Sequence, residues 1–213
     1  MFFLNECGLN AVENGLVTRL YIFASIPVVL GIYFALLRKI DRPRLYTLLS
    51  VFIIAAIGWE IWLTYGIAGG LPVDMRRSAA MTCAIPTHLN WILNSLADVM
   101  MAWLGLLLVQ LAYRKKPSPF ERWHWTAFAI LLVWLIGQNV YVEAFIYHLQ
   151  LGSNGDLSWA PMHPLGSWFN PTLFVLGGSK VTLQAQMSWM FMTPIVYALA
   201  IYFHKRRAAE SEG

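Results

Sequence analysis

The sequence predicts an all-α membrane protein, a bundle of five transmembrane helices beneath an outer cap of loops. Apolar residues make up 58% of the 213 residues and charged residues only 12%, against about 25% in ordinary soluble domains. The ten Trp, nine Tyr and twelve Phe suit the aromatic belts found at membrane interfaces. Because the basic residues fall in short clusters between apolar segments, the formal charge of +4 does not indicate nucleic-acid binding. The lipid bilayer is the expected partner.

Five apolar segments approach the roughly 17–25 residues that a helix needs to cross a bilayer. These segments cover residues 16–37, 45–68, 89–113, 123–149 and 187–203. The fifth is at the short limit. The patch Trp168–Leu176 is too short to cross and contains Pro171, so we expect an interfacial or re-entrant segment there. Residues 1–213 are therefore expected to form a single transmembrane domain.

The basic residues fix the expected orientation. Eleven of the fifteen lie on one side, in the loop between the first two spans, in the loop between the third and fourth, and after the fifth. The positive-inside rule then places the N-terminus outside and the C-terminus in the cytoplasm. An odd number of spans agrees with this. The start of the chain lacks the basic region and cleavage site of a signal peptide, so the first span is expected to direct targeting.

The two cysteines, Cys7 and Cys83, are both assigned to the outer side. An oxidising compartment would permit a disulfide between them. Cysteine count alone cannot decide pairing, and the favoured interpretation is two unrelated small residues.

Polar residues recur every four positions in the third apolar stretch, Thr87–Tyr113. Asn90, Asn94 and Asp98 therefore share one stripe of a helix. A carboxylate near the middle of a membrane helix is costly and almost always faces a protein interior or a wet cavity. The amides also have a purely structural interpretation, because such groups commonly join membrane helices by hydrogen bonds.

Two other spans place polar groups at a similar depth. A rise of about 1.5 Å per residue puts Glu60, Asn139 and Glu143 in the outer half of the membrane, as it does Asn90. We therefore expect three helices to surround one buried polar chamber. A solvated position in the interface is the alternative for Glu143, and interhelical bonding is the alternative for Asn139.

Aromatic residues accompany these polar groups. Trp59 adjoins Glu60, and Tyr141 lies close to Glu143 in the sequence. In the fifth span a further stripe recurs at i, i+4 and i+8, for which ordinary helix packing is the alternative. We expect a hydrophobic small molecule to bind at Trp59, Asn90, Asn94, Asn139, Tyr141, Trp189, Thr193 and Tyr197.

The histidines give little indication of a metal or haem site. His88 and His148 would have to bind haem, or to join Glu143 around a metal. No tight two-histidine spacing supports either arrangement. We therefore expect neither a metal nor a cofactor.

The layout resembles that of the emopamil-binding family, which includes the sterol isomerases and the sigma-2-type receptors. Members are five-helix membrane bundles with an acid late in the second helix, another in the third, and a polar and aromatic set in the last. The matching positions here are Trp59, Glu60, Asp98, Trp189 and Thr193.

The resemblance extends over roughly residues 45–205, and the segment GQNVYVEAFIYHL (137–149) is similar to the family's fourth helix. Two positions differ from the isomerases. Ala56 stands where they have a His one turn before the acid, and Thr193 stands where they have an Asn. These differences count against sterol isomerisation itself.

The Trp59-Glu60 pair in AAIGWEIWLTYG is also similar to a pair in integral-membrane terpene cyclases of the fungal meroterpenoid type. Those enzymes usually have seven spans, whereas five are expected here. Both resemblances imply one chemistry, in which a buried carboxylic acid protonates an alkene or epoxide of an isoprenoid to give a carbocation. Glu60 would be the acid, and Asp98 or Glu143 would orient it or accept a proton. An aromatic wall would keep water from the cation.

Two other classes of function remain open. The first is a lipid or small-amine binding protein of the sigma-2 kind, in which a carboxylate pairs with a ligand cation. The second is a small transporter with Asp98 as a proton or ion relay, although the repeats and broken helices of transporters are not evident. The sequence leaves the oligomeric state open, a homodimer included.

Overall fold

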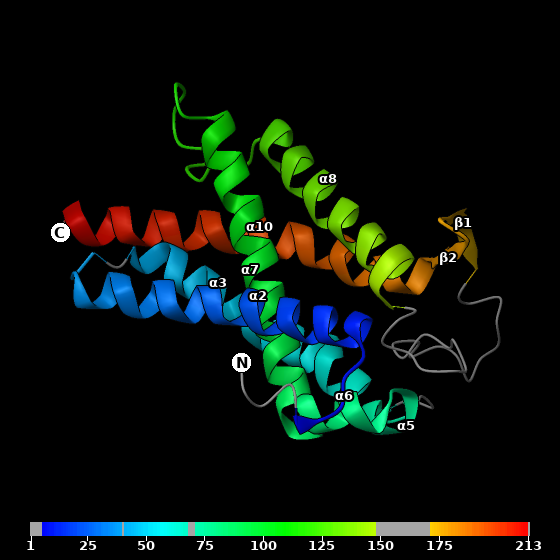
Figure 1. Ribbon diagram of the computed structural model, residues 1–213. Helices are drawn as coiled ribbons and strands as arrows, with labels where there is room; N and C mark the ends of the chain where they lie inside the picture. Colours follow the sequence, from blue (N-terminus) through cyan, green and yellow to red (C-terminus); the bar gives the residue numbers. More distant parts are fainter. Residues whose placement is uncertain (1–5, 40, 68–70, 148–170, 213) are drawn as a thin grey trace.

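The computed structural model describes residues 6–39, 41–67, 71–147 and 171–212 (Figure 1). Five helical segments are long and apolar enough to cross a membrane, which is compatible with an integral membrane protein. They are Ala11–Leu36, Arg42–Tyr65, Thr87–Ala112, Trp125–Ile146 and Leu183–Glu210. The predicted all-α class and the predicted number of membrane-spanning helices are confirmed.

Two of the spans contain a turn of π-helix, and one helix runs well past its apolar stretch. In chain order the elements are α2 (Ala11–Leu36), α3 (Arg42–Ala55), η1 (Ala56–Glu60), α4 (Ile61–Tyr65), α5 (Val73–Arg76), α6 (Ala79–Ala84), α7 (Thr87–Ala112), α8 (Trp125–Val142), η2 (Glu143–Tyr147), β1 (Thr172–Leu176), β2 (Ser179–Thr182) and α10 (Leu183–Glu212). The segments η1 and η2 are the π-helical turns. With 30 residues, α10 extends in both directions beyond the apolar stretch 187–203.

Helix α7 organises the bundle. It packs against α2, α3 and α8 and also contacts η1 and α4, while α10 packs against α3 and α8. Figure 1 shows α7, in green, crossing the blue helix α2. The third apolar stretch thus touches three of the other four spans, which places its polar stripe inside the protein.

The apolar core lies between α3, α7, α8 and α10. Its buried residues recur three or four positions apart on each helix, which gives every helix one inward face. Examples are Val51 and Ala55 on α3, Val99, Ala102, Leu106 and Val109 on α7, Leu131 and Leu135 on α8, and Met192 and Val196 on α10. Helix α2 contributes no residue to this core.

Gly105 permits the close approach of α7 and α8. A Cβ atom at this position would lie 2.6 Å from Leu131 Cδ1 and 2.8 Å from Trp134 Cδ1. Next to this contact, the indole nitrogen of Trp134 donates a hydrogen bond of 2.8 Å to the Met101 carbonyl on α7. The two helices therefore pack closely where Gly105 has no side chain, and the hydrogen bond from Trp134 joins them beside this contact.

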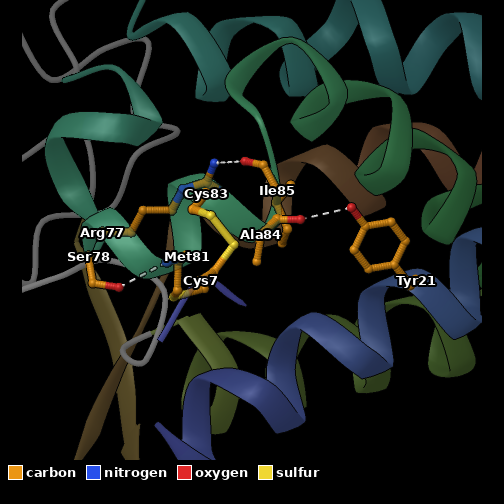
Figure 2. Close-up of a disulfide and its surroundings, with 8 residues drawn as sticks. All are labelled: Cys7, Tyr21, Arg77, Ser78, Met81, Cys83, Ala84 and Ile85. Carbon is orange, nitrogen blue, oxygen red and sulfur yellow. Dashed lines mark hydrogen bonds between the residues drawn. A yellow bond between two sulfur atoms is a disulfide. The ribbon is translucent and has the colours of Figure 1, made fainter. Parts of the chain in front are cut away.

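A disulfide joins Cys7, which precedes α2, to Cys83 on the short helix α6 (Figure 2). The favoured interpretation of two unrelated cysteines was therefore wrong, because residues 76 positions apart in sequence meet in the fold. Tyr21 donates a hydrogen bond of 2.9 Å to the Ala84 carbonyl. Leu16, Val17, Met81, Ala84 and Ile85 form a second apolar cluster beside the disulfide.

A β-hairpin precedes α10. Strands β1 and β2 are antiparallel, with Val175 opposite Lys180 and Leu176 opposite Ser179. Gly177 and Gly178 connect them with φ values of +61° and +85°, as a type I′ turn requires. An interfacial or re-entrant segment was expected at Trp168–Leu176. Thr172–Leu176 is instead a strand with all five residues exposed, and residues 168–170 lie outside the described residues.

Candidate functional site

The second span changes its helical winding just where its acid lies. Residues Ala56–Glu60 form the π-helical turn η1, so Trp59 and Glu60 are its last two residues. A π turn inside an α-helix is rare and is frequent at functional sites. Trp59 is 8% exposed and Glu60 is 7% exposed. The turn packs against α7, which carries Asp98.

Trp59 and Asp98 are in direct contact. The indole Nε1 of Trp59 donates a hydrogen bond of 2.9 Å to Asp98 Oδ2. The Glu60 carboxyl interacts electrostatically with Asp98. We call Glu60 and Asp98 the acid pair, because two carboxyl groups from different spans share one small region. Asp98 is partly buried, whereas Glu60 is almost fully buried.

An aromatic surface from the fifth span lies beside the acid pair. The rings of Trp59 and Trp189 have centroids 5.9 Å apart at an interplanar angle of 53°. Trp189 is 3% exposed. A tilted pair of indoles adds to core stability and presents electron-rich faces that attract cations.

Ser95 lies on α7 one turn before Asp98 and is fully buried. Its Oγ finds no hydrogen-bond partner among the residues that the structure describes. A buried hydroxyl without a partner is unusual, because leaving it unsatisfied costs about 1–3 kcal/mol.

A buried guanidinium group interacts with the acid pair. Arg76, at the end of α5, interacts electrostatically with Glu60. Its Nε donates a hydrogen bond of 2.6 Å to the Leu71 carbonyl, and its Nη2 donates to the Leu63 carbonyl on α4. Arg76 is 6% exposed, so the outer cap brings a buried positive charge to the edge of the site.

The neighbouring Arg77 holds the cap on the third span. Its Nη1 donates a hydrogen bond of 2.9 Å to Asn90 Oδ1, and its Nη2 donates to the Ile85 carbonyl. Asn90 Nδ2 in turn donates to Thr64 Oγ1 at 2.9 Å. Burial, and then the nearby charge of Arg76, lowers the pKa of Arg77 to about 10, so the side chain remains charged at neutral pH. Asn90 thus joins two spans and the cap.

Glu143 and Asn139 belong to a second polar cluster, which we call the Glu143 network. Thr182 donates to Glu143 Oε1 from its backbone nitrogen at 2.9 Å and from its hydroxyl at 2.7 Å. Gln186 Nε2 donates to Glu143 Oε2 at 2.7 Å. Asn139 Nδ2 donates to the Ala185 carbonyl at 2.7 Å and to Gln186 Oε1 at 3.1 Å. The network fastens α8 and η2 to β2 and the start of α10.

The remaining predicted site residues lie apart from the acid pair or use their polar groups locally. Asn94 donates to the Asn90 carbonyl, and Thr193 donates to the Trp189 carbonyl, each within its own helix. Tyr141 is 52% exposed on the outside of α8. Tyr197 donates to the Pro119 carbonyl at 2.7 Å and accepts from the His124 backbone nitrogen, at the end of the bundle away from the cap.

The roles of Arg76, Arg77 and Ser95 and the two π turns were not predicted from the sequence. The dipeptide Arg76-Arg77 carried a weak signal, because it is the only basic pair in the predicted outer loops. Ser95 carried none, since small hydroxyl residues are common in membrane helices. The π turns could not be predicted, because they produce no distinct spacing of apolar residues in the sequence.

Among the residues that the structure describes, His, Cys, Asp and Glu side chains form no group of three that could hold a metal. His88 lies with its Nδ1 3.1 Å from the hydroxyl of Tyr65. His148, the other histidine considered for haem or metal binding, lies outside the described residues. The described side chains therefore give no support to a metal or haem site.

Comparison with known proteins does not add to this description. No family model, curated protein or solved structure matches the chain. The argument for function therefore depends on the acid pair and its surroundings.

Proposed function

We propose that this protein is a membrane-embedded isomerase or cyclase that protonates an alkene or epoxide of an isoprenoid through a buried carboxylic acid. The observation that carries the proposal is the acid pair, in which Glu60 is buried next to Asp98 and Asp98 is held by Trp59. Such chemistry needs one proton donor, one proton acceptor and a dry aromatic wall. Residues from η1, α7 and α10 supply all three.

Glu60 is the proposed acid. Removal from water favours the neutral form of a carboxylic acid, which is the form that can donate a proton. Transfer of that proton to an alkene carbon, or to an epoxide oxygen as the ring C–O bond breaks, leaves a carboxylate on Glu60 and a cation on a substrate carbon. The Arg76 guanidinium, which interacts with Glu60, then stabilises the new carboxylate.

Asp98 is the proposed acceptor. Its Oδ2 accepts the Trp59 hydrogen bond, which fixes the carboxylate against η1. Loss of a proton from the cation to Asp98 completes an isomerisation or a cyclisation with no net change in atoms. The faces of Trp59 and Trp189 stabilise the cation in the meantime. Glu143 takes no part here, because its oxygens accept three hydrogen bonds within the Glu143 network.

The test follows deuterium from heavy water into the carbon skeleton of a panel of isoprenoid alkenes incubated with the detergent-purified protein, and epoxides are scored by their conversion to product. We expect incorporation by the wild type and almost none by Glu60→Gln, which keeps the shape but lacks the transferable proton. Deuterium incorporation by Asp98→Asn should be lower than that of the wild type by roughly 10²–10⁴-fold, the usual contribution of one acid–base group. Glu121→Gln is the matched control, since Glu121 is exposed in the loop before α8. Normal incorporation by a folded Glu60→Gln protein would remove Glu60 from the role of acid.

One observation also favours a second function. Two carboxyl groups against two indoles would bind a lipophilic ammonium ion by charge and by cation–π attraction. In that case the protein is a binding protein for small amines or lipids. It would retain the ligand unchanged, and the wild type would incorporate no deuterium across the whole panel.

For the orientation we propose an outer N-terminus and a cytoplasmic C-terminus. Arg207 pairs with Asp41 at 3.1 Å and Arg44 donates to Gln110 at 2.9 Å, so the ends of three basic clusters meet at one end of the bundle. The disulfide lies at the other end and suits an oxidising compartment. Single cysteines at Ser118 and Met75, probed with an impermeant maleimide, should react from the cytoplasm and from outside, respectively. The reverse labelling would overturn this orientation.

A further inference from the structure

A groove runs between α2 and α3 along α7, and neither residue of the acid pair lines it. Its volume is about 390 Å³, within the roughly 300–1,000 Å³ of ligand pockets. Its walls are mainly apolar and include Val28, Ile32, Leu45, Leu48, Phe52 and Val99. The lining residues on α3 recur at Leu45, Leu48, Leu49 and Phe52, so they form one face about 10 Å long.

The groove lies beside the C-terminal half of α2, whereas the disulfide lies next to the N-terminal end of this helix. There the disulfide and the second apolar cluster hold it against α6. Farther along, Val28 is 43% exposed and Ile32 is 56% exposed, although both line the groove. These side chains lie within a membrane-spanning helix, so the open groove faces the hydrocarbon of the bilayer.

One end of the groove is cationic. Lys39, Asp41 and Arg44 line it. The Asp41 carboxylate is shared by Arg44 at 3.6 Å and Arg207 at 3.1 Å, so its negative charge is already offset. Lys39 is exposed and has no ion pair or hydrogen bond among the side chains that the structure describes. Since α2 ends and α3 begins here, this end lies where lipid headgroups meet the protein.

We propose that the groove is a binding site for a phospholipid with an anionic headgroup. One acyl chain lies between α2 and α3 along α7, and the phosphate lies between Lys39 and Arg44. Arg and Lys donate strong charge-assisted hydrogen bonds to phosphate, and basic pockets between membrane helices select anionic headgroups. A zwitterionic lipid would bring its own cation next to Lys39. The site is independent of the acid pair and of the proposed function.

The test is native mass spectrometry of the full-length protein in detergent with phosphatidylglycerol or phosphatidylcholine of identical chains. Gly31 lines the groove, and a Cβ placed there has no atom within 4 Å, so Gly31→Phe is the variant chosen to fill the groove. Gly15→Phe is the matched control, because Gly15 is on the same helix, equally unobstructed, and outside the groove. Lys39→Gln removes one charge, and Lys115→Gln is its control.

We expect the wild type to retain one phosphatidylglycerol at least tenfold more tightly than phosphatidylcholine. Gly31→Phe and Lys39→Gln should each weaken phosphatidylglycerol binding several-fold or more, while Gly15→Phe and Lys115→Gln bind as the wild type does. Equal retention of the two lipids would overturn the proposal, as would unchanged binding by both groove variants. A dimer that Gly31→Phe dissociates, with no change in bound lipid, would overturn it too, because the occupant would then be a second copy of the chain.

Discussion

The indole nitrogen of Trp59 lies 2.9 Å from Asp98 Oδ2, which joins the π turn of the second span to the middle of the third. The same indole packs against Trp189 on α10. One side chain therefore links three spans around the acid pair. Its Nε1 donates to the Asp98 carboxyl group, and the ring itself packs against the Trp189 ring.

Trp59→Phe should separate these two roles. Phenylalanine keeps an aromatic face against Trp189 but cannot donate to Asp98. A hydrogen bond to a charged group contributes about 1.5–3 kcal/mol, so deuterium incorporation should fall by roughly 10- to 100-fold. Trp62→Phe, on the next turn of the same span, controls for the loss of an indole. Unchanged incorporation by Trp59→Phe would show that Asp98 needs no such orientation.

The Glu143 network should tolerate an exchange of donor and acceptor. Glu143→Gln places an amide against the amide of Gln186, and the mismatch should cost about 1–3 kcal/mol of stability. Adding Gln186→Glu lets the new amide at position 143 donate to the new carboxylate at position 186. The second oxygen of that carboxylate still accepts the hydrogen bond from Asn139. Thermal unfolding of both variants and the wild type measures the recovery. A double variant no more stable than Glu143→Gln would contradict the arrangement.

Gly105 should be intolerant of a side chain. Gly105→Ala puts a Cβ within 2.8 Å of Leu131 and Trp134, and such overpacking typically costs about 1–3 kcal/mol. Gly137→Ala is the control, because nothing lies within 4 Å of a Cβ there. The midpoint of thermal unfolding should fall for the first variant only. Equal midpoints would mean that α7 and α8 can separate without loss.

The disulfide should be detectable and stabilising. Reduction should shift the mobility of the wild type on nonreducing electrophoresis, and Cys7→Ser should abolish the shift. Losing a cross-link of this sequence separation typically costs about 2–4 kcal/mol, so the unfolding midpoint should also drop. Two thiols that react with an alkylating reagent before any reduction would refute the bridge.

The sequence predicted the spans and the acid pair because apolar length and four-residue spacing are local signals. Position along a helix axis was also accessible, since each residue advances a helix by about 1.5 Å. The direction in which a side chain points around that axis was not. The Glu143 carboxyl was expected to face the same chamber as Glu60, yet it binds Thr182 and Gln186. A π turn adds a residue to one turn and rotates all that follows.

The stripe in the fifth span shows a different limit. Trp189 and Tyr197 share a helix face, but eight residues separate them by about 12 Å along the axis. Trp189 therefore meets Trp59, whereas Tyr197 reaches the Pro119 loop. The hydrogen bond between Arg77 and Asn90 could not be predicted from the spacing of residues along the chain. The two residues belong to different elements, and the relative placement of these elements depends on the whole fold.

The bridge between Cys7 and Cys83 imposes an order on biosynthesis. Cys7 lies before the first span and Cys83 lies after the second. The disulfide therefore cannot form until the second span has crossed the membrane and α6 has been made. Until then the first helix lacks part of its apolar cluster, which also needs residues of α6. Expression under reducing conditions should therefore yield chains in which only noncovalent packing, against α7 and within this cluster, holds the first helix.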